Sequence, residues 1–225
     1  MIESIGRRLL VAFSRGAGAE AGDDAGLPPA RIMAPEVEFI AYGEDCLLSG
    51  RVRLDAERLS DMLNQHDEYL LVDVMVERLD DTGAAIEVKE VLVHRDELLL
   101  VHATGPRGTQ ARRQRTRLHP LGMQLGPYHV RGYLHALPGS DPLLAIRRRK
   151  PMVPLTEAWV EYGTGSVRQR RRVGALVVNR EQLDWVVPAL DDEVEMPDLP
   201  LAAEQGPLLK DFTGSILLEP MDPAH

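Results

Sequence analysis

Cysteine is nearly absent from the 225 residues, since Cys46 is the only one. One thiol excludes an internal disulfide and a cysteine-based zinc site. We therefore expect Cys46 to be a small buried hydrophobic residue of a protein in a reducing, cytoplasmic compartment. Aromatic residues are also scarce, at 4% of the chain. The hydrophobic core must therefore be built mainly from Val, Leu, Ile and Met.

Long apolar runs are missing as well. The longest one near the N-terminus covers residues 9–13, which is too short for a secretory signal or a membrane span. Apolar residues do fall on one helical face here, at Ile2, Ile5, Leu9, Ala12 and Phe13. This pattern fits a short amphipathic helix against a membrane, a partner or the protein itself, and it also fits a frayed terminus. We do not expect a membrane protein.

Signatures of catalysis and of metal binding are lacking too. The chain has no GxSxG, no P-loop, no dinucleotide-binding glycine motif and no HExxH. His129 and His135 lie on one expected strand, but six residues of strand separate them by about 20 Å. Asp73 and Glu77 are separated by about 13 Å of strand, too far to share a proton. We therefore expect a protein without catalysis, metal or cofactor.

The clearest positive feature is an internal repeat. Three segments match in order: residues 48–52 with 130–134, 74–77 with 158–161, and 93–98 with 178–183. Their offsets are 82, 84 and 85 residues. Small changes in loop length produce such a slow drift in one direction, whereas chance matches would scatter. The sequence therefore predicts two diverged copies of one unit, residues 36–103 and 122–187.

Both copies have the pattern of β-strands. In the first copy, Leu70, Val72, Val74 and Val76 alternate with the residues between them, which places these four on one expected face. The strands expected there are residues 70–77, 86–93 and 98–102, with an Asp-Asp-Thr-Gly turn after the first. The second copy repeats the pattern with strands at residues 155–161, 173–178 and 183–187 and a Gly-Thr-Gly-Ser turn.

The segments that precede the central hairpins differ between the copies. Residues 55–64 place Leu59, Met62 and Leu63 at helical spacing, which predicts a short helix. The counterpart contains Pro138, Gly139 and Pro142, which favour a loop.

These patterns predict a mainly all-β fold of two small antiparallel β-barrel-like repeats, since closure into a barrel removes exposed strand edges. The expected organisation has five parts. They are an N-terminal segment with a flexible linker (1–35), an acidic repeat (36–103), a basic linker (104–121), a basic repeat (122–187) and an acidic disordered tail (188–225). Met75 and Trp159 occupy matching positions between acidic residues and are candidates for a contact surface.

The closing segments resemble a known pattern. The stretch VLVHRDELLLV, and LVVNREQLDWV in the second copy, are similar to the last strands of Sm-like barrels. The segment RLSDMLN followed by EYLLVDVMVE resembles an uncharacterised bacterial family of small β domains of unknown function. Sm-like relatives often bind RNA through ring assemblies. The inserted helix and the lack of a glycine after Arg95 or Arg180 depart from the Sm-like pattern, so the resemblance implies only a fold.

Charge is strongly segregated along the chain. Residues 36–98 contain 17 acidic and 6 basic residues, a net charge of −11. Residues 105–175 contain 3 acidic and 14 basic residues, a net charge of +11. The tail from residue 188 contains 9 acidic residues and 1 lysine, a net charge of −8. Because the copies share a scaffold but have opposite charge, fold maintenance alone does not account for the difference.

The basic residues form three clusters that are candidates for binding an anion or a partner. They are Arg112, Arg113, Arg115 and Arg117 in the linker, Arg147, Arg148, Arg149 and Lys150 before the central strand, and Arg168, Arg170, Arg171 and Arg172 on the hairpin. Arginine suits bidentate contacts with phosphate or carboxylate. Convergent clusters would form one anion-binding surface, beside which Tyr128, Tyr133 and Trp159 could stack on bases. The alternative is that the arginines are solvated or pair with the protein's own acids.

Three functions are compatible with these patterns. The first is a non-catalytic interaction module whose charge-complementary repeats bind a protein partner or self-associate. The second is a nucleic-acid-binding protein that uses the basic repeat and is inhibited by its own acidic tail. The third is an enzyme without a recognisable motif. No small-molecule substrate is indicated.

Overall fold

The computed structural model describes residues 34–79, 85–108, 115–164, 167–190 and 194. The first unit, residues 36–102, contains β1 (Glu36–Tyr42), β2 (Cys46–Arg53), α1 (Leu59–Leu63), β3 (Glu68–Arg78), β4 (Ile86–His94), the short 3-10 helix η1 (Arg95–Glu97) and β5 (Leu100–His102). The second unit, residues 117–188, contains β6 (Arg117–Leu125), β7 (Tyr128–Ala136), α2 (Pro142–Arg147), β8 (Met152–Thr164), β9 (Val167–Asn179), the 3-10 helix η3 (Arg180–Gln182) and β10 (Trp185–Pro188).

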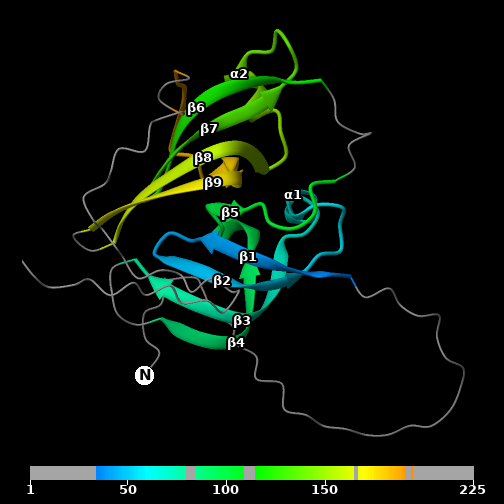
Figure 1. Ribbon diagram of the computed structural model, residues 1–225, viewed down its shortest axis with the longest axis vertical. Coiled ribbons are helices and arrows are strands. Elements are labelled where there is room, and N and C mark those ends of the chain that lie inside the picture. The colour runs from blue at the N-terminus through cyan, green and yellow to red at the C-terminus, as the bar shows by residue number, and fades with distance from the viewer. Residues whose placement is uncertain (1–33, 80–84, 109–114, 165–166, 191–193, 195–225) are drawn as a thin grey trace, which may run out of the picture.

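All of these strands belong to one antiparallel sheet. Its order is β10-β6-β7-β8-β9-β5-β1-β2-β3-β4, so the second unit occupies one half of the sheet and the first unit the other. Figure 1 shows this progression from β6 at the top, through β5 in the middle, to β4 at the bottom. The fold is therefore mainly β, as the sequence predicts.

The sheet is open, so the expectation that each repeat closes its edges into a barrel is wrong. The cause is the position of β5, which pairs with β1 on one side and with β9 of the second unit on the other. A strand has two hydrogen-bonding edges, and both edges of β5 are therefore occupied. Within the described residues, β4 pairs with β3 alone and β10 pairs with β6 alone.

Both units bend at a β-bulge in the same place. The register of β2 against β3 shifts at Gly50, and that of β7 against β8 shifts at Gly132. The facing residues Asp73 and Glu157 have φ angles of 49° and 48°, in the left-handed region that non-glycine residues rarely adopt. A Cβ atom on Gly50 would lie 3.0 Å from the carbonyl oxygen of Val72. Glycine is therefore required where the two backbones approach.

The bulge at Asp73 also changes which face of β3 is buried. Before it, Leu71 is fully buried and Leu70 is 54% exposed; after it, Val74 and Val76 are buried. The prediction that Leu70 shares one face with Val74 and Val76 is therefore wrong. The extra residue of a bulge shifts the two-residue alternation by one position.

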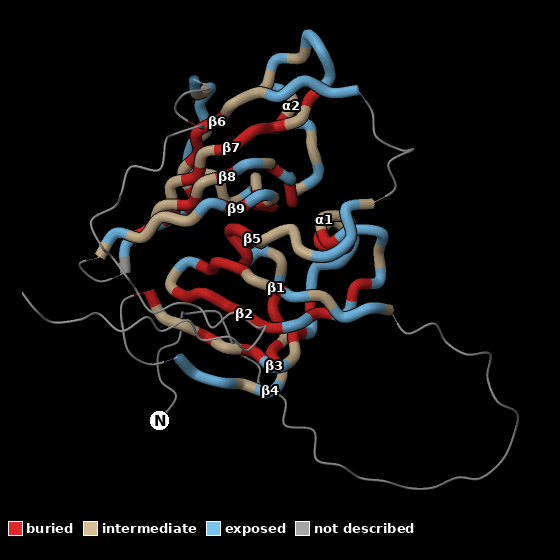
Figure 2. The backbone as a smooth tube through the Cα atoms, viewed as in Figure 1, coloured by how far each residue is buried: buried red, intermediate tan, exposed pale blue. Residues whose placement is uncertain are grey.

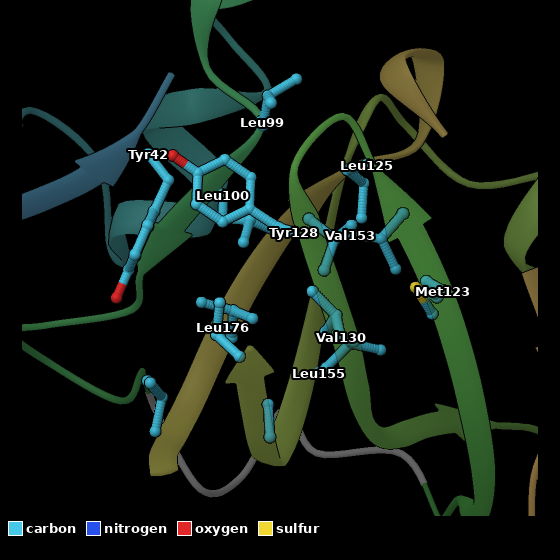
Figure 3. Close-up of a cluster of buried hydrophobic side chains, with 14 of the residues drawn as sticks. Tyr42, Leu99, Leu100, Met123, Leu125, Tyr128, Val130, Val153, Leu155 and Leu176 are labelled. Atoms are coloured by element: carbon cyan, nitrogen blue, oxygen red, sulfur yellow. The ribbon is translucent and has the colours of Figure 1, made fainter. Parts of the chain in front are cut away.

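The hydrophobic core joins the units. One cluster combines Tyr42, Leu99 and Leu100 of the first unit with Tyr128 and Leu176 of the second. Figure 3 shows these side chains together. A second cluster includes Met152 and Val177 of the second unit within the core of the first. The units therefore pack as one body, and Figure 2 shows buried segments continuing through the β5–β9 junction.

The helix expected within residues 55–64 is present as α1. The loop expected around Pro142 is not entirely a loop, because α2 begins there. Proline is compatible with the first turn of a helix, where its missing N–H has no partner to lose. The Asp141 carboxylate accepts hydrogen bonds from the backbone N–H groups of Leu143 and Leu144, which caps the helix.

Several expectations lie outside the described residues. They are the N-terminal helix and linker, Arg112 and Arg113, and the acidic tail apart from its first few residues and Val194. Among the helices of the described part, none has the length and apolarity to cross a membrane.

Candidate interaction surfaces

The outer face of the β8–β9 hairpin combines an aromatic ring with arginines and carboxylates. Trp159 lies opposite Arg172 and Glu161 opposite Arg170, so these four side chains share one face. The guanidinium carbons of Arg170 and Arg172 lie 4.8 and 5.9 Å from the centre of the Trp159 ring. Both distances are within the range of cation–π attraction.

Carboxylates of the same hairpin already pair with these arginines. Glu161 forms ion pairs of 2.7 Å with Arg168 and 3.0 Å with Arg170, and Glu157 pairs with Arg172 at 3.0 Å. Arg168, Arg170 and Arg172 therefore have carboxylate partners, which agrees with the alternative that the arginines pair with the protein's own acids. The cross-strand register places each carboxylate next to an arginine, which sequence spacing alone did not reveal.

Arg171 points to the opposite, inner face of the hairpin. It lies opposite Val160, which is fully buried. Its charge acts on Tyr42, His102 and Glu77 of the first unit. Arg171 is therefore part of the contact between the units rather than of an external surface.

His102 is the histidine of this inner cluster, and its pKa is strongly shifted. Burial, together with the positive charge of Arg171, lowers the pKa of His102 to about 4. Its Nε2 atom lies 2.9 Å from the Tyr42 hydroxyl oxygen. The Tyr42 ring packs edge-on against Tyr128 and Tyr162, at centroid distances of 5.3 and 5.9 Å. Burial also raises the pKa of Tyr42. The cluster is a packed junction of neutral rings around one arginine.

The described residues of the other two basic clusters converge at one end of the second unit. Arg117 lies opposite Ala136 at the end of β7, and the Thr116 hydroxyl oxygen lies 3.2 Å from His135 Nδ1. Arg149 donates a hydrogen bond to the carbonyl oxygen of His135. We call the exposed cations gathered there the basic end: Arg115, Arg117, Arg147, Arg148 and Lys150.

The basic end is separate from the hairpin arginines. Along β8, nine residues separate Met152, beside the basic end, from Glu161, opposite Arg170. This is about 30 Å of strand at about 3.3 Å per residue. The basic end and the hairpin arginines therefore do not form one surface. No ion pair involves the basic end within the part of the chain that the structure describes.

The two residues expected to form a contact surface differ in their surroundings. The Trp159 indole N–H donates a hydrogen bond of 2.9 Å to the carbonyl oxygen of Val194, which is itself buried. Val194, which follows β10 in the chain, thus contacts Trp159. Met75 is half-buried and lies opposite Ser49 and Glu87.

Two further candidate surfaces are the outer edges of β4 and β10. Exposed apolar side chains lie on both strands: Ile86 is 41% exposed on β4, and Trp185 and Val187 are 43% and 47% exposed on β10. Figure 2 shows much of β4 as exposed or half-buried at one end of the sheet. The sequence patterns did not predict these edges, because a closed barrel has no free strand edge.

The described residues contain a solvent-open hollow but no candidate metal site. A solvent-open hollow of about 340 Å³ lies near the hairpin tip, lined by Pro127, His129, Glu161, Tyr162, Gly163, Val167 and Arg168. No three His, Cys, Asp or Glu side chains of the described residues gather where they could hold a metal ion.

No protein-family model, curated protein or solved structure matches the chain.

Proposed function

We propose that the chain is a non-catalytic interaction module that self-associates through the complementary charges of two diverged β units. The observation that carries this proposal is that residues 36–98 of the first unit have a net charge of −11, whereas residues 105–175, which contain most of the second unit and part of the linker before it, have a net charge of +11. Opposite charges on one scaffold favour contacts between the acidic half of one molecule and the basic half of another.

Equivalent backbone hydrogen bonds support the proposed duplication. Leu99 N–H donates to Tyr42, as Asp184 N–H donates to Gln124. Likewise, Arg95 N–H donates to Asp67, as Arg180 N–H donates to Pro151. These pairs preserve the offsets of 82 to 85 residues found in the sequence.

We also propose that each unit is a distant relative of the Sm-like and small β domains that the sequence resembles. In both units an apolar strand ends at a 3-10 turn that begins with arginine, and a short strand then follows, as β4–η1–β5 and as β9–η3–β10.

The basic end provides the cationic side of the contact. Its five side chains are exposed, and the hairpin arginines are already paired with Glu157 and Glu161. Free cations attract a partner's carboxylates more strongly than cations that already have a counterion at about 3 Å. Self-association should therefore depend on the basic end more than on the hairpin.

A matched pair of variants tests this proposal. Arg147 and Arg148 are changed to Gln in one variant, and Arg168 and Arg172 in the other, so each variant loses two positive charges. Light scattering at low salt should give a smaller mean mass for the basic-end variant than for the hairpin variant. A monomeric wild-type protein at low salt would overturn the proposal, as would an equal effect of the two variants.

A second candidate function, nucleic-acid binding, is favoured by the same basic end. Five exposed cations that have no carboxylate partner among the described residues match the electrostatic requirement of a phosphate backbone. A tail with a net charge of −8 would compete for this surface at a local concentration in the millimolar range. We expect deletion of residues 190–225 to tighten binding of single-stranded RNA about tenfold, on the order of 1.4 kcal/mol.

Fluorescence anisotropy at two salt concentrations measures this binding. The Arg147 and Arg148 substitutions should weaken it and flatten its salt dependence, whereas the Arg168 and Arg172 substitutions should change it less. If neither the full-length nor the shortened protein binds RNA at low salt, the second candidate is excluded.

A further inference from the structure

The two units are joined by a pairing of two strands. The strands equivalent to this pair lie elsewhere in the molecule and are not paired with each other. β5 of the first unit pairs antiparallel with β9 of the second, with Leu100 opposite Val178, Val101 opposite Val177 and His102 opposite Leu176. Leu100, Val101, Val177 and Val178 are each fully buried. The junction thus combines backbone hydrogen bonds with apolar burial.

The counterparts of these two strands are at the ends of the sheet. By the repeat offset of 85, β4 corresponds to β9 and β10 corresponds to β5. Their outer edges have no strand partner in the described residues. One molecule therefore contains one β5–β9 junction and the two separate halves of another.

Residues of the paired strands β5 and β9 are more buried than the equivalent residues of β10 and β4, whose outer edges are unused. Trp185 is 43% exposed, whereas its equivalent Leu100 is fully buried. Leu92 is half-buried, whereas its equivalent Val177 is fully buried. The unused edges thus have apolar side chains at the positions that the internal junction covers, and a row of unpaired backbone groups recruits another strand.

We propose that β10 of one molecule pairs with β4 of a second copy, in the arrangement of the internal β5–β9 junction. This inference rests on the proposed self-association and names its surfaces. Transferring the register of the internal junction places Trp185 opposite Val93, Val186 opposite Leu92 and Val187 opposite Val91 of the second copy. The pairing joins the basic unit of one molecule to the acidic unit of the next.

The side-chain contact beside the junction becomes an ion pair in this arrangement. Within the molecule, Asn64 at the C-terminal end of α1 hydrogen-bonds the backbone of Met152 at the start of β8. By the offset of 84, the equivalents are Arg148, at the C-terminal end of α2, and Glu68, at the start of β3. Both are exposed. Arg148 of the basic end would therefore meet Glu68 of the next copy.

Pro188 limits the length of the new pairing. Its equivalent Ala103 donates a backbone hydrogen bond to Ala175 across the internal junction. Proline has no N–H, so the pairing ends after three residues, as β5 does. Because the two edges differ, the contact is heterologous, and repetition produces a ring or a filament.

Cysteine cross-linking tests the pairing and its register. Leu92→Cys and Val186→Cys are made as separate full-length proteins, which are mixed at low salt and oxidised with diamide. Facing residues of an antiparallel pair are close enough for a disulfide. The native Cys46 is fully buried, and wild-type protein oxidised alone is the baseline.

We expect a disulfide-linked dimer from the mixture and none from either variant alone. Lys89→Cys, three residues along β4 from Leu92, is the out-of-register control and should cross-link with Val186→Cys much less. A dimer of Leu92→Cys with itself, or equal cross-linking by the Lys89→Cys control, would overturn the register.

A charge-exchange experiment distinguishes the β4–β10 pairing from self-association in general. Arg148→Glu and Glu68→Arg should each lower the mean mass at low salt, and the double variant should restore it. If the wild type self-associates but shows neither the cross-link nor the restored mass, self-association stands and the β4–β10 pairing is wrong. A monomeric wild type would reject both.

Discussion

Asn64 and Met152 exchange two hydrogen bonds across the boundary between the units. The Asn64 amide nitrogen donates to the Met152 carbonyl oxygen at 2.7 Å, and the Asn64 amide oxygen accepts from the Met152 N–H at 3.0 Å. The side chain thus satisfies the same backbone groups that a neighbouring strand would. Asn64 therefore adds a contact between the units at the start of β8, beside the β5–β9 junction.

Replacing Asn64 by Ala should destabilise the protein by about 2–3 kcal/mol. The substitution leaves the backbone N–H and C=O of the buried Met152 without their Asn64 partners, and each loss costs about 1 kcal/mol or more. Denaturant unfolding measures the change. The neighbouring exposed Gln65→Ala is the control and should change stability by less than about 0.5 kcal/mol. Equal stabilities of the two variants would contradict the role of Asn64.

His102 should make the folded state sensitive to acid. Its pKa is lowered to about 4 by burial and by Arg171, from a usual value near 6.5. Between these pH values the unfolded chain binds a proton that the folded state does not. The stability contribution is therefore present above pH 6.5 and is lost as the pH falls toward 4.

The comparison of wild type with His102→Gln isolates this effect, because glutamine keeps a hydrogen-bonding side chain but does not titrate. On lowering the pH from 7 to 4, the wild type should lose about 2–3 kcal/mol more than the variant. Denaturant unfolding at several pH values gives both curves. Parallel curves would show that His102 does not carry this proton linkage.

The two bulge glycines should respond alike to substitution. A Cβ atom on Gly50 would lie 3.0 Å from the Val72 carbonyl oxygen, and one on Gly132 would lie 3.1 Å from the Ala158 Cβ. Gly50→Ala and Gly132→Ala should each destabilise by about 1–3 kcal/mol, since backbone must shift to relieve the contact. Gly174→Ala on β9 is the control, because no atom lies within 4 Å of its added Cβ. Thermal or denaturant unfolding that ranks Gly174→Ala with the other two would contradict the steric explanation.

The two carboxylates of the outer hairpin should differ in importance. Glu161 and Arg170 have side chains only 14% and 12% exposed, whereas Glu157 and Arg172 are 55% and 60% exposed. Glu161→Gln should therefore destabilise by about 1–2 kcal/mol, because a poorly hydrated arginine loses its counterion. Glu157→Gln should cost less than about 1 kcal/mol. Chemical denaturation of both variants checks the order, and the reverse order would contradict it.

Local patterns predicted much of the fold. The alternation around residues 70–77, the turn residues after it and the short strand that follows Arg95 all indicate β-structure, and β3, β4 and β5 lie there. Helical spacing of Leu59, Met62 and Leu63 likewise predicts α1. These features depend on neighbouring residues, so a sequence window contains the necessary information.

The other features of the fold depend on pairing between strands that are distant in sequence, so local patterns could not predict them. Leu70 and Leu71 exchange faces because of a bulge whose position depends on contact between Gly50 and another strand. Arg171 lies between two outward arginines in sequence yet points inward, which is determined by the register of β9. The pairing of β5 with β9 leaves no local signature, and it converts two expected barrels into one open sheet.

The mass of the wild-type protein at two salt concentrations tests the central claim most directly. Exposed charges attract over about 8 Å at physiological salt and over longer distances at low salt. Light scattering should give a mean mass above that of the 25.0 kDa chain at low salt, which falls toward 25.0 kDa as salt is raised. A mass of 25.0 kDa at every salt concentration would contradict self-association through complementary charge.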